Sequence, residues 1–241
     1  MRWKFILGLL TTCAVLMSMS YTMLIPFLPM YLIQDLGVVK ADVDMWSGAI
    51  FAITFLVSGI MAPIWGALAD KKSRKLMALR AGFCLAITYF LGGLVTNPWE
   101  LLGFRFIQGL SAGLWPALLA IISVESPKLK LGFCMGVMQG GMTAGGVLGP
   151  LFGGLLADQF GMRMAFFIAA AALFLITLAL LFFVKEEPRK PDPNAKPVKI
   201  WDFSLCKIPA VKRMLICAGV VQLTILMQQP IMPCLLYTSP S

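Results

Sequence analysis

The sequence predicts an all-α membrane protein: a six-helix bundle of two inverted three-helix repeats, followed by the start of a seventh helix. Hydrophobic residues make up 59% of its 241 residues and charged residues 13%, and the mean hydropathy is +0.87. A soluble domain of this length cannot bury so much apolar surface. In addition, six apolar runs are long enough to cross a bilayer, and one sequence pattern occurs twice, 88 residues apart. These three observations place the chain in a membrane.

The six predicted spans are separated by short connections. About 20 apolar residues are needed to cross roughly 30 Å of hydrocarbon as a helix. The runs that meet this length are 5–33, 45–69, 77–96, 99–124, 131–157 and 162–184. The first run follows basic residues, as a secretory signal would, but it is far longer than a signal core and lacks a cleavage site of small residues. It is therefore predicted to remain as a span.

The chain divides into three regions. Residues 1–184 form the six-span bundle, 185–211 a cytoplasmic linker and 212–241 a truncated seventh span. Prolines between residues 188 and 197 discourage helix, whereas apolar residues mixed with charged ones from Ile200 to Ile208 can form an amphipathic helix on the membrane surface. The final residues carry no basic anchor, so we interpret them as a truncated or wrongly joined end.

The repeated pattern closes the second span of each trio. Gly66–Lys75 reads GALADKKSRK, and Gly154–Arg163 reads GLLADQFGMR. Trios of spans related by a pseudo-axis in the membrane plane are typical of secondary transporters. The repeat therefore predicts inverted trios and favours a transport function.

Basic residues predict the orientation. All Lys and Arg residues fall on the side of the N-terminus except Lys40 and Arg163 on the other side and Arg105 within a span; Arg80 is assigned to the second connection. By the positive-inside rule, the chain is a multi-pass protein of the plasma or inner membrane with a cytoplasmic N-terminus. The net charge of +9 is thus explained without nucleic acid, because the basic residues are divided among loops.

Several residue types needed for catalysis or metal binding are absent or unsuitably spaced. The chain has no histidine, and its six cysteines show no paired spacing. Free buried thiols are expected, and we predict no metal, no cofactor and no enzymatic activity.

Arg105 is the one basic residue placed inside a span. A guanidinium in hydrocarbon is costly, so Arg105 should face the bundle interior with polar partners, and Gln108 and Gly109 share its face of the helix. The alternative is an arginine that extends to the outer surface. No carboxylate lies at mid-membrane in the six spans.

Two further features carry alternatives. Glycines at a spacing of four line the fifth span, which lets a neighbouring backbone approach closely and serves packing as well as transport. The turn at Asp70 is either a plain solvated turn or a conformational latch, in which Asp70 pairs with an arginine or a helix N-terminus. The predicted latch residues are Gly66, Asp70, Arg74 and Lys75.

Three motifs together resemble the major facilitator superfamily, in its drug/proton antiporter branch. The stretch from Gly66 to Lys75 is similar to the family's loop motif between helices two and three, with Ser73 in place of the usual glycine. The second motif is Arg105, Gln108 and Gly109, which the family associates with proton transfer. The third, the family's antiporter motif, comprises Gly145, Gly149, Pro150, Gly153 and Gly154.

The resemblance implies the N-terminal half of a twelve-helix transporter, whose other six-helix half is missing here. Protons would drive a small hydrophobic substrate outward by alternating access across the lipid bilayer. Aromatic or pliable side chains suit such a cavity, and the candidates are Met17, Tyr21, Trp115, Met138, Gln139 and Met142. The alternatives are a metabolite or sugar transporter of the same fold and a membrane scaffold without transport. Half a transporter cannot close a cavity, so we expect this chain alone to be inactive.

Overall fold

The computed structural model describes residues 2–71 and 73–184, together with 211–214, 216–221 and 223–224; of residues 2, 70 and 71 it describes the backbone alone. Within these ranges the chain is helical and has no strand. The predicted linker, apart from residue 211, and most of the predicted seventh span lie outside the described residues. The described residues from 211 onward are helical.

Eight α-helices and two short 3-10 helices build the described bundle. Their bounds are α1 Arg2–Met23, α2 Leu28–Gln34, η1 Lys40–Asp42, α3 Val43–Lys71, α4 Arg74–Leu94, α5 Pro98–Leu110, α6 Leu114–Glu125, η2 Lys128–Lys130, α7 Leu131–Phe160 and α8 Met162–Phe183. Six stretches of this part of the chain are long and apolar enough to cross a membrane. The structure therefore confirms the all-α class and the six predicted spans.

Two of the predicted spans are not continuous helices. The first, expected over 5–33, ends as α1 at Met23 and resumes as α2, because Pro26 lacks the N–H that a continuing helix needs. The fourth, expected over 99–124, is split into α5 and α6. Gly113 precedes α6 with φ of +120°, a backbone conformation that favours glycine. Proline and glycine thus override the apolar pattern at these two points.

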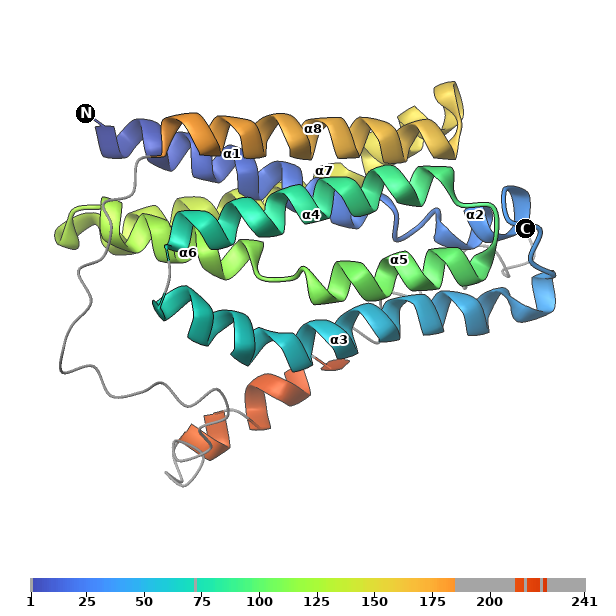
Figure 1. Ribbon diagram of the computed structural model, residues 1–241, viewed down its shortest axis with the longest axis horizontal. Coiled ribbons are helices and arrows are strands. Elements are labelled where there is room, and N and C mark those ends of the chain that lie inside the picture. The colour runs from blue at the N-terminus through green and yellow to red at the C-terminus, as the bar shows by residue number, and fades with distance from the viewer. Residues whose placement is uncertain (1, 72, 185–210, 215, 222, 225–241) are drawn as a thin grey trace.

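The helices pack as two related trios (Figure 1). The bounds of α3 and α7 differ by 88 or 89 residues, and so do those of α4 and α8. The main packing pairs are α1 with α7, α3 with α5, and α4 with α8. Exchanging the trios converts the first pair into the second and leaves the third unchanged, so the contacts obey the symmetry that the sequence repeat predicts.

The two copies of the repeated pattern lie at opposite ends of the bundle. In Figure 1 the α3–α4 turn lies at the same end as the N-terminus and the α6–α7 connection, whereas the α7–α8 turn lies at the other end with α2. Trp3 marks the N-terminal end, where the amines of Lys4 and Lys130 lie 5.8 and 5.4 Å from its ring centroid. Opposite placement is what inverted repeats require.

Glycines let α7 approach α1 closely. A Cβ added at Gly145 would collide with the carbonyl oxygen of Val15, and one added at Gly149 would collide with Thr22. Gly153 has the same relation to Met23. The neighbouring backbone that the glycine spacing predicts is therefore that of α1.

Candidate transport cavity and the Arg105 cluster

A cavity of about 440 Å³ lies among the helices of both trios, within the size range of small-molecule sites. Its wall comes from α1, α3, α4, α5, α6 and α7 and is mostly apolar. Aromatic and methionine side chains alternate there with a few hydroxyl and amide groups. They include Met17, Tyr21, Tyr89, Gln108, Trp115 and Met142.

Four of the six predicted cavity residues line this space: Met17, Tyr21, Trp115 and Met142. Met138 does not, because it is fully buried in an apolar cluster with Leu10 and Cys13. Gln139 does not either, since its side chain is exposed and lies outside this lining. Met138 is as apolar as Met142, and only packing separates these two methionines.

Arg105 is held in the bundle interior. Its relative exposure is 5%, so it does not extend to the surface as the alternative interpretation required. The guanidinium Nη1 donates to Gln108 Oε1 at 3.1 Å, one turn along α5. The carbonyl oxygen of Arg105 accepts a hydrogen bond from Thr54 Oγ1 at 3.4 Å. An added Cβ at Gly109 would lie 2.8 Å from the carbonyl oxygen of Thr54, so this glycine lets α5 sit close to α3.

A second, very small cavity lies beside Arg105. It measures about 10 Å³ and is lined by Thr88, Tyr89, Arg105 and Gln108, among others. That volume matches about one water molecule, and the wall offers several polar groups. Arg105 Nη2 is buried without a hydrogen-bond partner. Tyr89 and Gln108 line both cavities and so form the partition between them.

Tyr89 is a site residue that the sequence analysis missed. It is 3% exposed, and its hydroxyl donates to the carbonyl oxygen of Ser20 in α1 at 3.0 Å. A tyrosine in an apolar span resembles any other packing residue. The signal available was its hydroxyl, since a buried hydroxyl needs a partner.

The break between α5 and α6 is closed by two side chains from the first trio. Trp65 Nε1 donates to the carbonyl oxygen of Leu110 at 2.8 Å, and Arg80 Nη2 donates to that of Ala112 at 3.1 Å. The Arg80 guanidinium lies 3.3 Å from the centroid of the Trp65 ring. Arg80 therefore belongs to the interior of α4, and its assignment to the second connection was wrong.

The predicted latch residues lie at the α3–α4 turn. Gly66 is inside α3, where an added Cβ would meet nothing within 4 Å, and Arg74 begins α4. Ser73 caps α4, because its hydroxyl accepts a hydrogen bond from the Leu76 N–H at 3.1 Å. Lys75 Nζ donates to the carbonyl oxygen of Leu181, near the end of α8, at 2.6 Å. The side chain of Asp70 lies outside the described residues.

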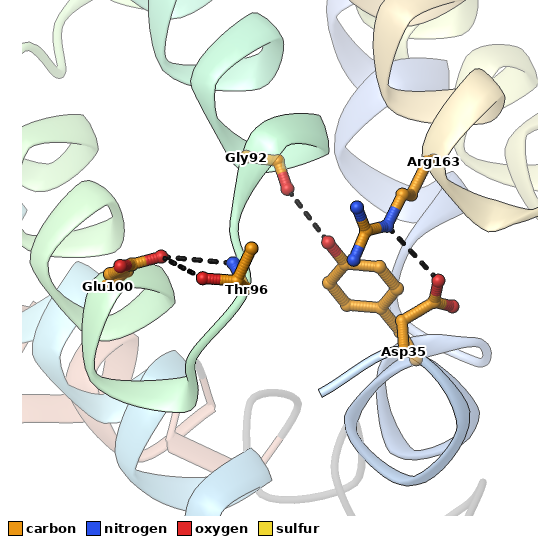
Figure 2. Close-up of polar contacts among 6 residues, drawn as sticks. Asp35, Gly92, Thr96, Glu100 and Arg163 are labelled. Carbon is orange, nitrogen blue, oxygen red and sulfur yellow. Dashed lines mark hydrogen bonds and ion pairs between the residues drawn. The ribbon is translucent and has the colours of Figure 1, made fainter. Parts of the chain in front are cut away.

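The opposite end carries a polar cluster that the sequence analysis did not foresee (Figure 2). Arg163 Nε pairs with Asp35 Oδ1 at 3.2 Å. The Tyr31 hydroxyl donates to the carbonyl oxygen of Gly92 at 3.1 Å. Glu100 Oε2 accepts from the Thr96 N–H at 3.0 Å and from its hydroxyl at 3.3 Å. These contacts join α2, the end of α4 and the starts of α5 and α8.

The antiporter-motif residues all lie in α7. Gly145, Gly149 and Gly153 face α1, Gly154 approaches Phe27, and Pro150 is inside the helix. These glycines therefore fix how tightly α1 and α7 pack.

Two inverted trios around a membrane-embedded cavity define the first half of a secondary-transporter fold. The sequence agrees, since residues 10–239 match the Major Facilitator Superfamily. The chain belongs to that family, and it is a transporter-family protein rather than an enzyme.

Curated relatives agree with this family, and a solved structure shares the fold. The chain is 42% identical over 186 residues to the multidrug resistance protein MdtG of Citrobacter koseri, covering 77% of this chain and 46% of that protein. It is 40% identical over 187 residues to MdtG of Yersinia enterocolitica, covering 77% and 45%. A bacterial homologue of the human lysosomal transporter Spinster, solved inward-facing and unoccupied, superposes with a TM-score of 0.68 at 24% identity, covering 86% of this chain and 48% of that one. The chain spans about half the length of the curated relatives that it matches.

Proposed function

We propose that this chain forms the first half of a proton-coupled exporter of small hydrophobic compounds, working by alternating access with a second six-helix half. The observation that carries the proposal is the 440 Å³ cavity lined by aromatic and methionine side chains. Such pliable surfaces accept varied apolar ligands. A metabolite or sugar site would need more polar groups than this wall supplies. The similarity to proteins named for multidrug resistance points the same way.

For proton coupling, the residues proposed are Arg105, Gln108 and Gly109. A guanidinium offers only hydrogen-bond donors, so the role of Arg105 would be to set the electrostatics of a neighbouring proton carrier rather than to carry the proton. Arg105 is buried and donates a hydrogen bond to Gln108, which lines the cavity, and this position supports that role. Gly66, Asp70, Arg74 and Lys75 are proposed as the latch, and the α7 glycines as the close contact that keeps α1 and α7 together.

For orientation, we propose that the N-terminus lies in the cytoplasm. Among the described residues of 2–184, the basic residues other than Lys40, Arg163, Arg80 and Arg105 belong to the start of α1, the α3–α4 turn and η2. In Figure 1 these three segments lie at the same end of the bundle. Alkaline phosphatase fused after Ser73 should be inactive, and the same enzyme fused after Gly161 should be active. Activity at both positions would overturn the inverted arrangement.

The transport proposal is tested with a chimera, because the chain spans only half of its relatives. Residues 1–184 replace the matching part of the Citrobacter koseri relative, and uptake of radiolabelled chloramphenicol, an uncharged aromatic compound, is measured in inside-out vesicles. An imposed proton gradient should drive accumulation, and a protonophore should abolish it. The parent relative is measured in parallel for comparison.

Arg105→Ala in the chimera should abolish gradient-driven uptake without changing the amount of protein in the membrane, whereas Lys40→Ala, at a helix end, should leave uptake unchanged. Uptake that resists the protonophore would argue against antiport. Unchanged uptake in Arg105→Ala would remove Arg105 from the coupling residues.

A further inference from the structure

Another large hollow lies on the outside of the bundle, between α4 and α8. Its volume is about 350 Å³, and every residue that lines it is apolar and belongs to one of these two helices. Ile87, Phe90 and Phe174 in its wall are 55%, 51% and 46% exposed, so the hollow opens away from the bundle. We call it the α4–α8 groove. It shares no lining residue with the 440 Å³ cavity.

Two pairs of phenylalanine rings frame the α4–α8 groove. The ring centroids of Phe90 and Phe167 lie 5.3 Å apart, and those of Phe83 and Phe174 lie 5.6 Å apart. Phe167 and Phe174 lie two turns apart on α8, which is about 10 Å along the helix axis. Alanines of both helices line the groove, and their short side chains leave the space between the two ring pairs unfilled.

An apolar groove on a membrane-spanning surface suits a hydrocarbon chain. Water gains little there, because the walls offer no polar side chain as a hydrogen-bond partner. If the groove were empty, its walls would lose the dispersion contacts that close packing supplies. The acyl chain of a lipid is the apolar ligand that a bilayer supplies, and it is flexible enough to fill a narrow space between rings.

A cation lies near one end of the groove. Arg163 is the second residue of α8, and Phe167 follows one turn later on the same helix face, about 6 Å along the axis. A Cβ added at Gly93, near the end of α4, would lie 2.9 Å from the Phe167 ring, so the two helices are in close contact there. In Figure 2 Arg163 and Gly92 lie at this end of the bundle.

The Arg163 guanidinium has donors to spare. Its Nε donates to Asp35, whereas Nη1 and Nη2 have no hydrogen-bond partner among the described residues. The side chain is 42% exposed. A planar guanidinium binds a phosphate through two parallel N–H donors. An apolar groove with such a cation one turn beyond its end therefore matches the two parts of a phospholipid, the acyl chain and the phosphate.

We propose that the α4–α8 groove holds one acyl chain of a glycerophospholipid from the leaflet on the side of α2, with the lipid phosphate on Nη1 and Nη2 of Arg163. The acyl chain lies between the two ring pairs, against the alanines of both helices. The phosphate lies about one helical turn beyond Phe167. Because this site shares no residue with the 440 Å³ cavity, the proposal does not depend on the export function.

Photolabelling with two lipids, one with and one without a phosphate, tests the site. The chain is reconstituted in phospholipid nanodiscs with a trace of phosphatidylcholine or of diacylglycerol, each carrying a diazirine midway along one acyl chain. Peptide mass spectrometry measures the labelling of Phe167 and Ala171 in the groove. The reference surface is Phe106 and Ile107 of α5, which are 43% and 44% exposed, because the start of α5 carries no basic residue. The ratio of phosphatidylcholine to diacylglycerol labelling in the groove is divided by the same ratio at the reference surface.

We expect a normalised ratio of about three, the size of preference that one exposed charge contact provides. Arg163→Gln should lower the ratio to about one. The matched control is Lys40→Gln, in η1 at the same end of the bundle, which should leave the ratio unchanged. Ala171→Trp adds a large side chain at an exposed position of the groove and should remove the labelling of Phe167 by both lipids.

A normalised ratio of one in the unaltered chain would overturn the proposal, whether or not Arg163→Gln folds. A ratio that a folded Arg163→Gln variant leaves unchanged would overturn it as well, and so would labelling of Phe167 that persists in Ala171→Trp. If a second copy of the chain covers the groove, neither lipid will label it and the proposal fails. None of these results bears on transport, so the export function and the lipid site stand or fall separately.

Discussion

Arg163 Nε donates to Asp35 Oδ1 at 3.2 Å, which ties the start of α8 to the end of α2 across 128 residues of sequence. Arg163 is the counterpart of Lys75 in the repeated pattern. Lys75 contacts the other end of α8, where it donates to the carbonyl oxygen of Leu181 at 2.6 Å. The two equivalent cations therefore fix α8 at both ends, one through a carboxylate and one through a helix carbonyl.

The Asp35–Arg163 pair should contribute little to stability, although it joins residues far apart in the sequence. The side chains are 25% and 42% exposed, and ion pairs screened in this way contribute about 0.5 kcal/mol. A double-mutant cycle with Asp35→Asn and Arg163→Gln, followed by thermal unfolding in nanodiscs, should give a coupling energy of that size. A coupling above about 2 kcal/mol would show that the pair is shielded from water.

Close packing of α7 on α1 should make Gly149 intolerant of a side chain. An added Cβ would lie 2.7 Å from the carbonyl oxygen of Met19, so Gly149→Ala should lower the free energy of unfolding by about 1–3 kcal/mol. The matched control is Gly140→Ala in the same helix, where a Cβ meets nothing within 4 Å. That control should be neutral or slightly stabilising, because alanine favours helix over glycine. Equal effects at both positions would contradict the α1–α7 contact.

Ser73 should act as an N-cap for α4. Ser73→Ala removes the oxygen that accepts the Leu76 N–H and should cost about 1 kcal/mol, whereas Ser73→Gly should cost only a few tenths. Thermal unfolding of the two variants distinguishes them. If both substitutions lower the stability equally, the Ser73 hydroxyl does not cap the helix. Glycine, the family's usual residue at this position, would then be equivalent to serine here.

Gln108 should be needed to keep the Arg105 charge inside the bundle. Gln108→Leu removes the acceptor of the Nη1 hydrogen bond and should destabilise the bundle by about 3 kcal/mol, as expected when a buried charge loses its partner. Gln108→Glu retains an acceptor and should be clearly more stable than Gln108→Leu. Folded yield and thermal unfolding provide the measurements, and equal stability of the two variants would show that Arg105 reaches water.

The spans could be predicted from sequence because a bilayer enforces them. Unbroken apolar runs and the two copies of GxLAD determine the number, order and inversion of the helices, and the predicted ends of the third, fifth and sixth spans agree with the structure to within three residues. The breaks in the first and fourth spans were not predicted. Pro26 and Gly113 mark these breaks, but proline and glycine also occur within intact membrane helices, so their presence alone does not predict a break.

The site was only partly predictable. Arg105 and Gln108 stand out because polar residues are rare in a span, and their pairing follows from a spacing of three residues on a helix. Met138 and Met142 are equally apolar, and the sequence does not reveal which of them faces the cavity. The Asp35–Arg163 pair joins residues far apart in the chain, and no local pattern indicates it. Such features depend on tertiary packing.

Breaking the fourth span leaves the carbonyl oxygens of Leu110 and Ala112 dependent on donors from other helices, as interrupted membrane helices require. Their donors, Trp65 and Arg80, come from helices that the ribosome makes earlier. We expect the fourth span to reach its final shape only once those helices are in the bilayer. The first trio would then act as a template for the second, and biosynthesis would set the sequence of assembly.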